Sequence, residues 1–182
     1  SINEITTGLF YKVVIAEGIG IYLYGINGTM NLFTWEETAF FVVYMFFDFA
    51  GYSKMARGLG RIYGIPTPIN FSLPFLSTSM TEFWTRWHIS LGDFIRKNLF
   101  TPIQLSLVRK CGLKWAQQTN LLTLIISFSF VGIWHRLTWK YFLWGIAMGI
   151  VLAIEKCLRD YKSKKSYKPG FLMNWGVRIL GP

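Results

Sequence analysis

The two histidines are the residues with the clearest chemical potential, and each directly follows a tryptophan. His88 lies in the segment 83–91 (FWTRWHISL), and His135 ends the segment 132–135 (GIWH). A neutral imidazole can accept a proton near physiological pH because its unperturbed pKa is about 6.5. In an apolar, aromatic environment an imidazole is costly unless it is hydrogen-bonded or takes part in chemistry. Each histidine is therefore either a satisfied core residue or a candidate catalytic base.

Two further charged residues lie at positions where charge needs an explanation. Asp48 is the one charged residue of the apolar run 38–50, and carboxylates inside a membrane tend to mark function or a fixed partner. Asp48 would orient a histidine or bind a polar substrate group, or else form an ion pair with an arginine. Arg86 would hold a phosphate of a donor molecule, or else pair with Glu82 or Asp93.

These residues do not have the pattern of a metal site. The two histidines are far apart in the sequence, and no cysteine pair or carboxylate cluster lies near them at ligand spacing. Cys111 and Cys157 are isolated thiols, so neither a disulfide nor a metal role is predicted for them.

The composition indicates a membrane protein. Of the 182 residues, 52% are hydrophobic and 18% are aromatic, whereas 15% are charged, which is more apolar than an ordinary soluble domain. The formal net charge of +10 would suggest a nucleic-acid partner for a soluble protein. Here the basic residues cluster between apolar runs, as in cytoplasmic loops rich in lysine and arginine, so no nucleic-acid partner is predicted.

The apolar runs predict an all-α, polytopic transmembrane helical bundle. The run 115–134 is long enough to cross a hydrocarbon core of about 30 Å at a rise of about 1.5 Å per residue, and the run 139–158 would return beside it as a hairpin. If the basic clusters at the other ends of both helices are cytoplasmic, the turn 132–139 carries His135 away from the cytoplasm.

Charged residues, glycines and prolines predict the structure of two other stretches. Residues 9–26 are apolar but contain Lys12 and Glu17, so they form either a tilted span or an interfacial helix. Residues 54–70 are basic and contain several glycines and prolines, and we expect a cytoplasmic loop there.

The segment around His88 has the pattern of an amphipathic helix at the membrane surface. Ser79 and Glu82 have the spacing of a capping box, which would start the helix. Apolar residues then recur at intervals of three and four over 83–97, and His88 would face the apolar side or its edge. Pro102 would end this helical pattern.

Four motifs of the chain are similar, in order and spacing, to those of a known family. They are DFAGYS at 48–53, NF at 70–71, FWTRWHISL at 83–91 and GIWH at 132–135. Together they resemble the membrane-bound O-acyltransferase (MBOAT) family, with the nearest match in its bacterial cell-envelope branch of alginate O-acetyltransferases and teichoic-acid D-alanyl transferases. The resemblance implies that residues 1–182 are a partial domain, an internal fragment of a longer polytopic protein whose N- and C-terminal spans are missing.

The resemblance also implies an activity and its residues. The protein would move an acyl group, most simply acetyl, from a cytoplasmic donor to a hydroxyl of an envelope or exported polysaccharide. His135 would be the general base and His88 a positioning or donor-side residue. The residues implied to bind substrate are Asp48, Arg86, Trp134 and Arg136.

The same resemblance implies the surroundings of the reaction. No bound cofactor is expected, and the acyl donor would be acetyl-CoA or an acyl-carrier thioester. The partners would be membrane lipid, the polysaccharide acceptor and a secreted esterase-like protein or a carrier protein. The location would be the bacterial cytoplasmic (inner) membrane, which the chain would cross several times.

Other functions remain open at the level of sequence. D-alanyl transfer to teichoic acid is the alternative within the same class. A transporter or channel segment would use Asp48, His88 and His135 as a polar relay, and a structural module would use its basic loops to hold anionic lipid. Neither of the last two roles requires a tryptophan before each histidine, so the motifs favour the enzyme.

Two features depart from the family pattern. Arg136 stands where the polysaccharide branch usually has glycine after the motif histidine; its cation would disfavour the protonated imidazole. It would bind an anionic group of donor or acceptor, or else the activity is altered. The glycine-rich loop of alginate-type members is absent after 83–91, which speaks against alginate as the acceptor.

Overall fold

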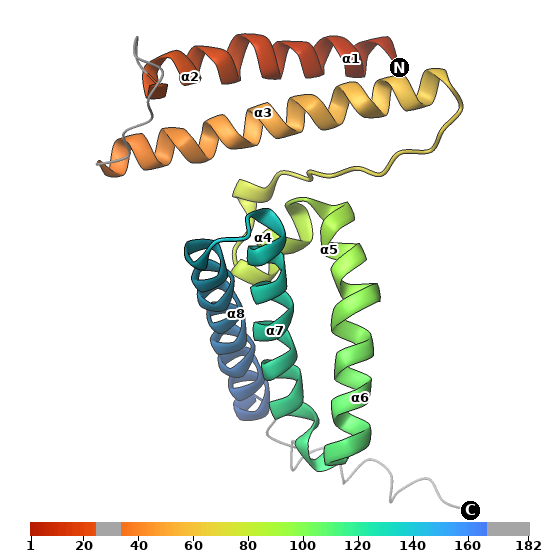
Figure 1. The fold of residues 1–182 in the computed structure, drawn as a ribbon, viewed down its shortest axis with the longest axis vertical. Coiled ribbons are helices and arrows are strands. Elements are labelled where there is room, and N and C mark those ends of the chain that lie inside the picture. Colours follow the sequence, from red (N-terminus) through yellow and green to blue (C-terminus); the bar gives the residue numbers. More distant parts are fainter. Residues whose placement is uncertain (25–33, 167–182) are drawn as a thin grey trace, which may run out of the picture. The chain divides into compact units, whose positions relative to one another are not determined.

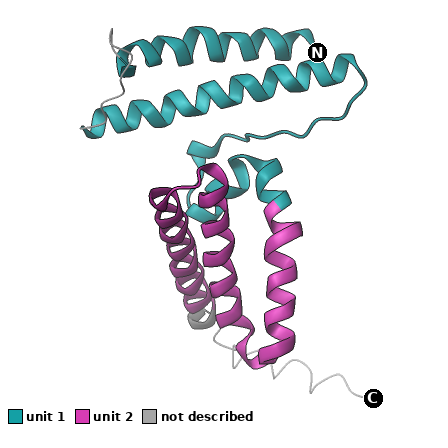
Figure 2. Cartoon of the chain, in the orientation of Figure 1, with its two compact units in different colours: residues 1–94 teal, residues 95–182 magenta. Residues whose placement is uncertain are grey.

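The chain is helical and divides into two units, Ser1–Phe94 and Ile95–Pro182 (Figure 2). The computed structural model describes residues 1–24 and 34–166. Within these ranges the one extended pairing is an isolated bridge between Phe71 and Trp87. The predicted all-α class is therefore confirmed.

The first unit begins with a long helix that pairs with a second one. Three consecutive segments, α1 (Ile2–Leu9), the π-helical η1 (Phe10–Ala16) and α2 (Glu17–Tyr24), form the first helix, which runs antiparallel to α3 (Trp35–Ile62) (Figure 1). The first helix is long and apolar enough to cross a membrane over Ile2–Tyr24. This favours the span over the interfacial helix for the predicted run 9–26, whose last two residues lie outside the described part.

Two glycines let the paired helices of the first unit approach closely. A Cβ atom on Gly8 would lie 2.6 Å from the carbonyl oxygen of Gly51, and a Cβ atom on Gly51 would lie 2.7 Å from the carbonyl oxygen of Gly8. Small residues are typical of such contacts between membrane helices because they let the backbones meet.

The predicted loop over 54–70 is wrong in its first half, because α3 continues to Ile62. The basic residues of this half are held by the neighbouring helix: Glu4 forms ion pairs with Arg57 (3.0 Å) and Arg61 (2.9 Å). The sequence signal was misleading because Gly58 serves helix packing rather than a turn. At Gly58, a Cβ atom would lie 2.5 Å from Cγ1 of Ile5 in α1.

The predicted single helix over 83–97 is also wrong. It is divided into α4 (Met80–Arg86) and α5 (Ile89–Ile95), and a short 3₁₀ turn, η2 (Pro74–Leu76), precedes it. Ser79 caps α4 as predicted, since its hydroxyl accepts a hydrogen bond from the Glu82 N–H (3.0 Å). The second half of the capping box differs, because the Glu82 carboxylate binds Thr78 instead.

The predicted helix end at Pro102 is wrong as well. Helix α5 passes without interruption into the π-helical η3 (Arg96–Phe100) and then into α6 (Thr101–Cys111). In a regular α-helix a proline ring clashes with the carbonyl group four residues earlier, here that of Asn98. The wider π-helical turn changes the register of these carbonyl groups, so the proline is accommodated as the second residue of α6.

The second unit contains the predicted hairpin of two long apolar helices. A 3₁₀ turn, η4 (Leu113–Trp115), leads into α7 (Ala116–His135), and α8 (Trp139–Ser166) returns beside it (Figure 1). Both are long and apolar enough to cross a membrane, over Leu113–His135 and Trp139–Ser163. The turn is shorter than predicted, since α7 includes His135.

The packing of the hairpin depends on close backbone contact, and a polar side chain joins α6 to it. A Cβ atom on Gly145 of α8 would lie 2.3 Å from the carbonyl oxygen of Phe128 in α7. Gln104 of α6 donates hydrogen bonds to the carbonyl oxygen of Ala116 (3.1 Å) and to Thr119 Oγ1 (3.2 Å), and accepts one from Thr123 Oγ1 (3.0 Å). Thr123 is fully buried, so these bonds satisfy polar groups inside the apolar packing.

Candidate active site

His135 lies at the end of α7, where the hairpin turns. Its ring is edge-on to those of Trp134 (5.1 Å between ring centroids) and of Trp144 in α8 (5.9 Å). The imidazole is exposed in the described part of the chain. The imidazole therefore has aromatic rings beside it and is not covered by the other described residues of the chain.

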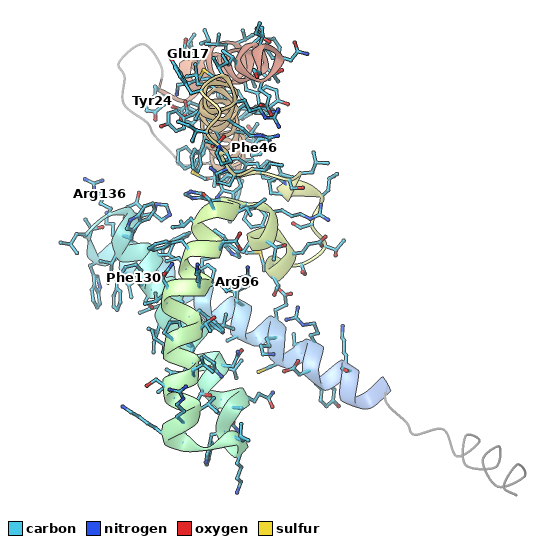
Figure 3. All side chains as sticks on the ribbon, turned by 90° about the vertical axis from the view of Figure 1, so that its right-hand side faces the viewer. Glu17, Tyr24, Phe46, Arg96, Phe130 and Arg136 are labelled. Atoms are coloured by element: carbon cyan, nitrogen blue, oxygen red, sulfur yellow. The ribbon has the colours of Figure 1, made fainter. Side chains whose placement is uncertain are left out.

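Two basic residues follow His135 in the sequence, one in the turn and one at the start of α8. Arg136 and Lys140 are both exposed, and Figure 3 shows the Arg136 side chain projecting outward from the turn. Hydrogen bonds from Arg136 N–H to the carbonyl oxygen of Gly132 (3.3 Å) and from Thr138 N–H to that of Arg136 (2.7 Å) fix the backbone. Trp134, His135 and Arg136, three of the predicted site residues, thus come from one short segment.

His88 lies in the first unit, at the break between α4 and α5, and its backbone is unusual. Its φ is +46°, in the left-handed region, which costs a residue other than glycine roughly 1–2 kcal/mol. The imidazole packs edge-on against Phe49 of α3, with 4.7 Å between ring centroids. Strain of this kind persists only where surrounding structure enforces it, and it is concentrated at functional sites.

An aromatic cluster holds the residue before His88 against α3. Trp87 is buried, and its ring contacts those of Phe46, Phe71, Phe75 and Phe83. Beside it, the N–H of Ser72 donates to the carbonyl oxygen of Arg86 (3.0 Å). The tryptophan of this Trp-His pair is therefore a packing residue.

Arg86 forms the helix ion pair that its spacing predicts. Its guanidinium group lies 2.6 Å from Glu82 Oε1 and 3.5 Å from the carbonyl oxygen of Leu73. Contact with a substrate stays a prediction for this residue.

Asp48 has a partner, but it is not the predicted arginine. Its carboxylate forms an ion pair with Lys12 of η1, and the ammonium group of Lys54 lies 5.5 Å from the ring centroid of the adjacent Tyr11. The prediction failed because it looked for an arginine, whereas Lys12 was noted only as an interruption of an apolar run. Opposite charges inside two neighbouring apolar runs are the signal that identifies such a pair.

The predicted site residues thus fall into three groups. Trp134, His135 and Arg136 share the hairpin end in the second unit, Arg86 and His88 share the α4–α5 break, and Asp48 lies on α3 with Lys12. Sequence reasoning missed Trp144 as a neighbour of His135, although the predicted hairpin brings the start of its second helix back beside the end of the first.

The Glu82 carboxylate gives this segment a pH-dependent contact. Hydrogen bonds from the N–H (2.7 Å) and hydroxyl (2.9 Å) of Thr78, followed by the charge of Arg86, hold the pKa of Glu82 below its usual value. Since the folded-state pKa is lower than the unfolded one, this stabilisation is present above the unfolded pKa and is lost as pH falls through the folded one.

We therefore expect Glu82→Gln to lower the unfolding temperature of the complete protein in detergent at pH 7. The difference from the wild type should shrink at acidic pH, where the wild-type carboxylate is also protonated. Glu36→Gln is the matched control, because Glu36 is exposed and lies in the first turn of another helix. An equal difference at both pH values would contradict the expectation.

Comparison with known proteins assigns the chain to a family. Residues 21–181 match the family model of MBOAT, membrane-bound O-acyltransferase family. The chain is 34% identical to a teichoic acid D-alanyltransferase of Streptococcus thermophilus, covering 93% of the chain and 44% of that protein. It is 35% identical to a probable alginate O-acetylase of Azotobacter vinelandii (95% and 33%) and 30% identical to a peptidoglycan O-acetyltransferase of Helicobacter pylori (92% and 31%).

The chain spans less than half the length of each of these relatives, and it includes both Trp-His pairs on which the resemblance rests. The family model covers both units, and the apolar helices agree with a membrane protein. The chain belongs to the membrane-bound O-acyltransferase family.

Proposed function

We propose that the complete protein transfers an acyl group from a thioester donor to a hydroxyl group of a cell-envelope polymer. The observation that carries this proposal is the family match over residues 21–181. In this chain the second Trp-His pair ends a helix long and apolar enough to span a membrane, and its imidazole is exposed among the described residues. The relatives are named for acyl transfer to teichoic acid, alginate and peptidoglycan, which supports a polymer of the envelope as the acceptor.

In the proposed reaction His135 is the general base. Its neutral imidazole takes the proton of the acceptor hydroxyl while the hydroxyl oxygen forms a bond to the carbonyl carbon of the thioester. The carbon–sulfur bond then breaks, and the departing thiolate takes the proton from the imidazolium. The histidine returns to its neutral form, and the acyl group has moved from sulfur to oxygen.

The other residues bind and orient in this proposal. Arg136, next to His135, binds an anionic group of the donor or acceptor, and Trp134 lines the approach to the imidazole. His88 and Arg86 act on the donor side. For Asp48 the Lys12 partner favours a role in holding α3 to the first helix, which weakens the alternative of an Asp–His relay for transport.

The charges of the second unit support an orientation in the membrane. Basic residues lie at the end of the hairpin opposite to His135, at the start of α7 and the end of α8; they include Lys114, Arg159 and Lys162. Loops rich in lysine and arginine face the cytoplasm, so His135 lies toward the outer face. We place the protein, on this basis, in the bacterial cytoplasmic membrane, with the donor entering from the cytoplasm and the polymer from outside.

Acyl incorporation by membranes that contain the complete protein tests this function. Labelled acetyl-CoA and a labelled D-alanyl carrier-protein thioester should be supplied in parallel, and the label should be measured in purified envelope polymers. Incorporation from acetyl-CoA identifies an O-acetyltransferase, for which a secreted esterase-like partner is the candidate. Incorporation from the carrier thioester identifies a D-alanyl transferase with a carrier-protein partner. The proposal fails if neither donor gives more incorporation than it gives with membranes that lack the protein.

A further inference from the structure

Three of the sequence motifs meet at the side chain of Asn70. Its Oδ1 atom accepts hydrogen bonds from the backbone N–H (3.2 Å) and the hydroxyl (2.6 Å) of Ser90, and its Nδ2 atom lies 3.4 Å from the hydroxyl oxygen of Ser53. Its backbone carbonyl oxygen accepts a further bond from the N–H of Ile89 (3.0 Å). One residue therefore connects the α4–α5 segment to α3.

These bonds explain why the helix is interrupted at His88. The first N–H groups of a helix have no partner within it, and in α5 the N–H groups of Ile89 and Ser90 are both satisfied by Asn70 from outside the helix. The helical hydrogen bonds of α5 start at the carbonyl oxygen of His88, which accepts a hydrogen bond from the N–H of Gly92 (3.0 Å). Asn70 thus caps α5, and His88 takes up the left-handed conformation between two separately anchored helices.

The same face of α3 holds both Asn70 and the imidazole of His88. Phe49, against which the imidazole packs, and Ser53, which contacts Asn70, are four residues apart on α3. Residues at this spacing lie one above the other on a helix. One short stretch of α3 therefore positions both parts of His88: Phe49 contacts its side chain, and Ser53 contacts the Asn70 that caps the following helix.

We propose that Asn70 is a positioning residue that sets the orientation of His88 for acyl transfer. This inference rests on the proposed function. Loss of the Asn70 side chain removes its hydrogen bonds to Ser90, which are the side-chain part of the external cap of α5. His88 can then leave the left-handed conformation and rejoin a continuous helix. Its imidazole then turns away from Phe49 and from the place where the reaction requires it.

The first test compares Asn70→Ala with Asn70→Asp in membranes containing the complete protein at matched amounts. We expect the alanine variant to lower kcat roughly ten- to hundredfold, since small misplacements have effects of this size. KM should change by less than about twofold. The aspartate variant keeps the oxygen that accepts from Ser90 and should recover most of the activity. Thr85→Ala is the control, because Thr85 is exposed and its hydroxyl donates to the carbonyl oxygen of Glu82 within the same helix.

The second test asks whether Asn70 acts through His88. In a double-mutant cycle, Asn70→Ala should have little further effect when His88 is already alanine, because residues that act as a unit are not additive. An Asn70→Ala variant with full activity, where His88→Ala is impaired, would overturn the inference. A further loss of the same size in the His88→Ala background would also overturn it.

A third measurement does not depend on activity. In a variant with His88→Cys and serine at all other cysteine positions, the rate of maleimide labelling reports the environment of position 88. Asn70→Ala should change this rate, whereas Thr85→Ala should not. If the wild type transfers no acyl group, the proposed function fails while the labelling rate still decides the positioning role. An unchanged rate in Asn70→Ala would refute that role even in an active enzyme.

Discussion

Replacing His135 with alanine is expected to lower the rate of acyl transfer by about 10²- to 10⁴-fold, the usual contribution of a positioned acid–base group. Alanine cannot accept the proton of the attacking hydroxyl, which then remains a weak nucleophile. His135 is exposed at the end of α7, so its truncation leaves no cavity and should hardly affect folding. The measurement is acyl incorporation into envelope polymer at matched protein levels, with the unfolding temperature recorded in parallel.

Leu137→Ala is a suitable control for this experiment, because Leu137 lies in the same turn and is 86% exposed in the described part of the chain. It should retain activity. Undiminished transfer in the His135→Ala variant would exclude His135 as the base and move attention to His88. A loss that accompanied a large drop in unfolding temperature would instead assign His135 a structural role.

Replacing Asp48 with alanine is expected to destabilise the protein by about 2.5–3.5 kcal/mol, the cost of an unpaired charge at the centre of a membrane helix. Lys12 lies near the middle of the 23-residue span Ile2–Tyr24, about 15 Å from its start at the helical rise per residue. Its ammonium group forms an ion pair with Asp48 of α3. Without that carboxylate the ammonium group must be moved to water or neutralised, and both disturb the contact between the two helices.

The double variant Lys12→Met with Asp48→Leu should recover most of this stability, because replacing both members of an ion pair held away from water by apolar residues is often nearly neutral. The measurement is the free energy of unfolding of the complete protein in lipid or mild detergent for the single and double variants. Unchanged stability in Asp48→Ala together with a higher KM would contradict the structural role and support the predicted contact with substrate.

The α3 helix and the π-helical stretch show where local signals failed. Glycine and basic residues over 54–62 resemble a loop, but three of them have partners in α1: Glu4 for the two arginines and Ile5 for Gly58. Pro102 resembles a helix end, but η3 changes the carbonyl register in front of it. In both cases the local propensity was overruled by contacts or backbone geometry that have no local sequence signature.

The sequence by itself determined the hairpin of α7 and α8, the membrane class and the two Trp-His pairs. Long apolar runs leave the backbone no alternative to helix in lipid, so their fold follows from composition and length. Only the tertiary structure decided the interruption at His88, its cap by Asn70 and the pairing of Asp48 with Lys12. The partners in the hydrogen bonds of the cap and in the ion pair lie 19 to 36 residues apart in the sequence. Hydrogen bonds and ion pairs between such distant residues depend on how helices pack, which no periodicity within one helix can specify.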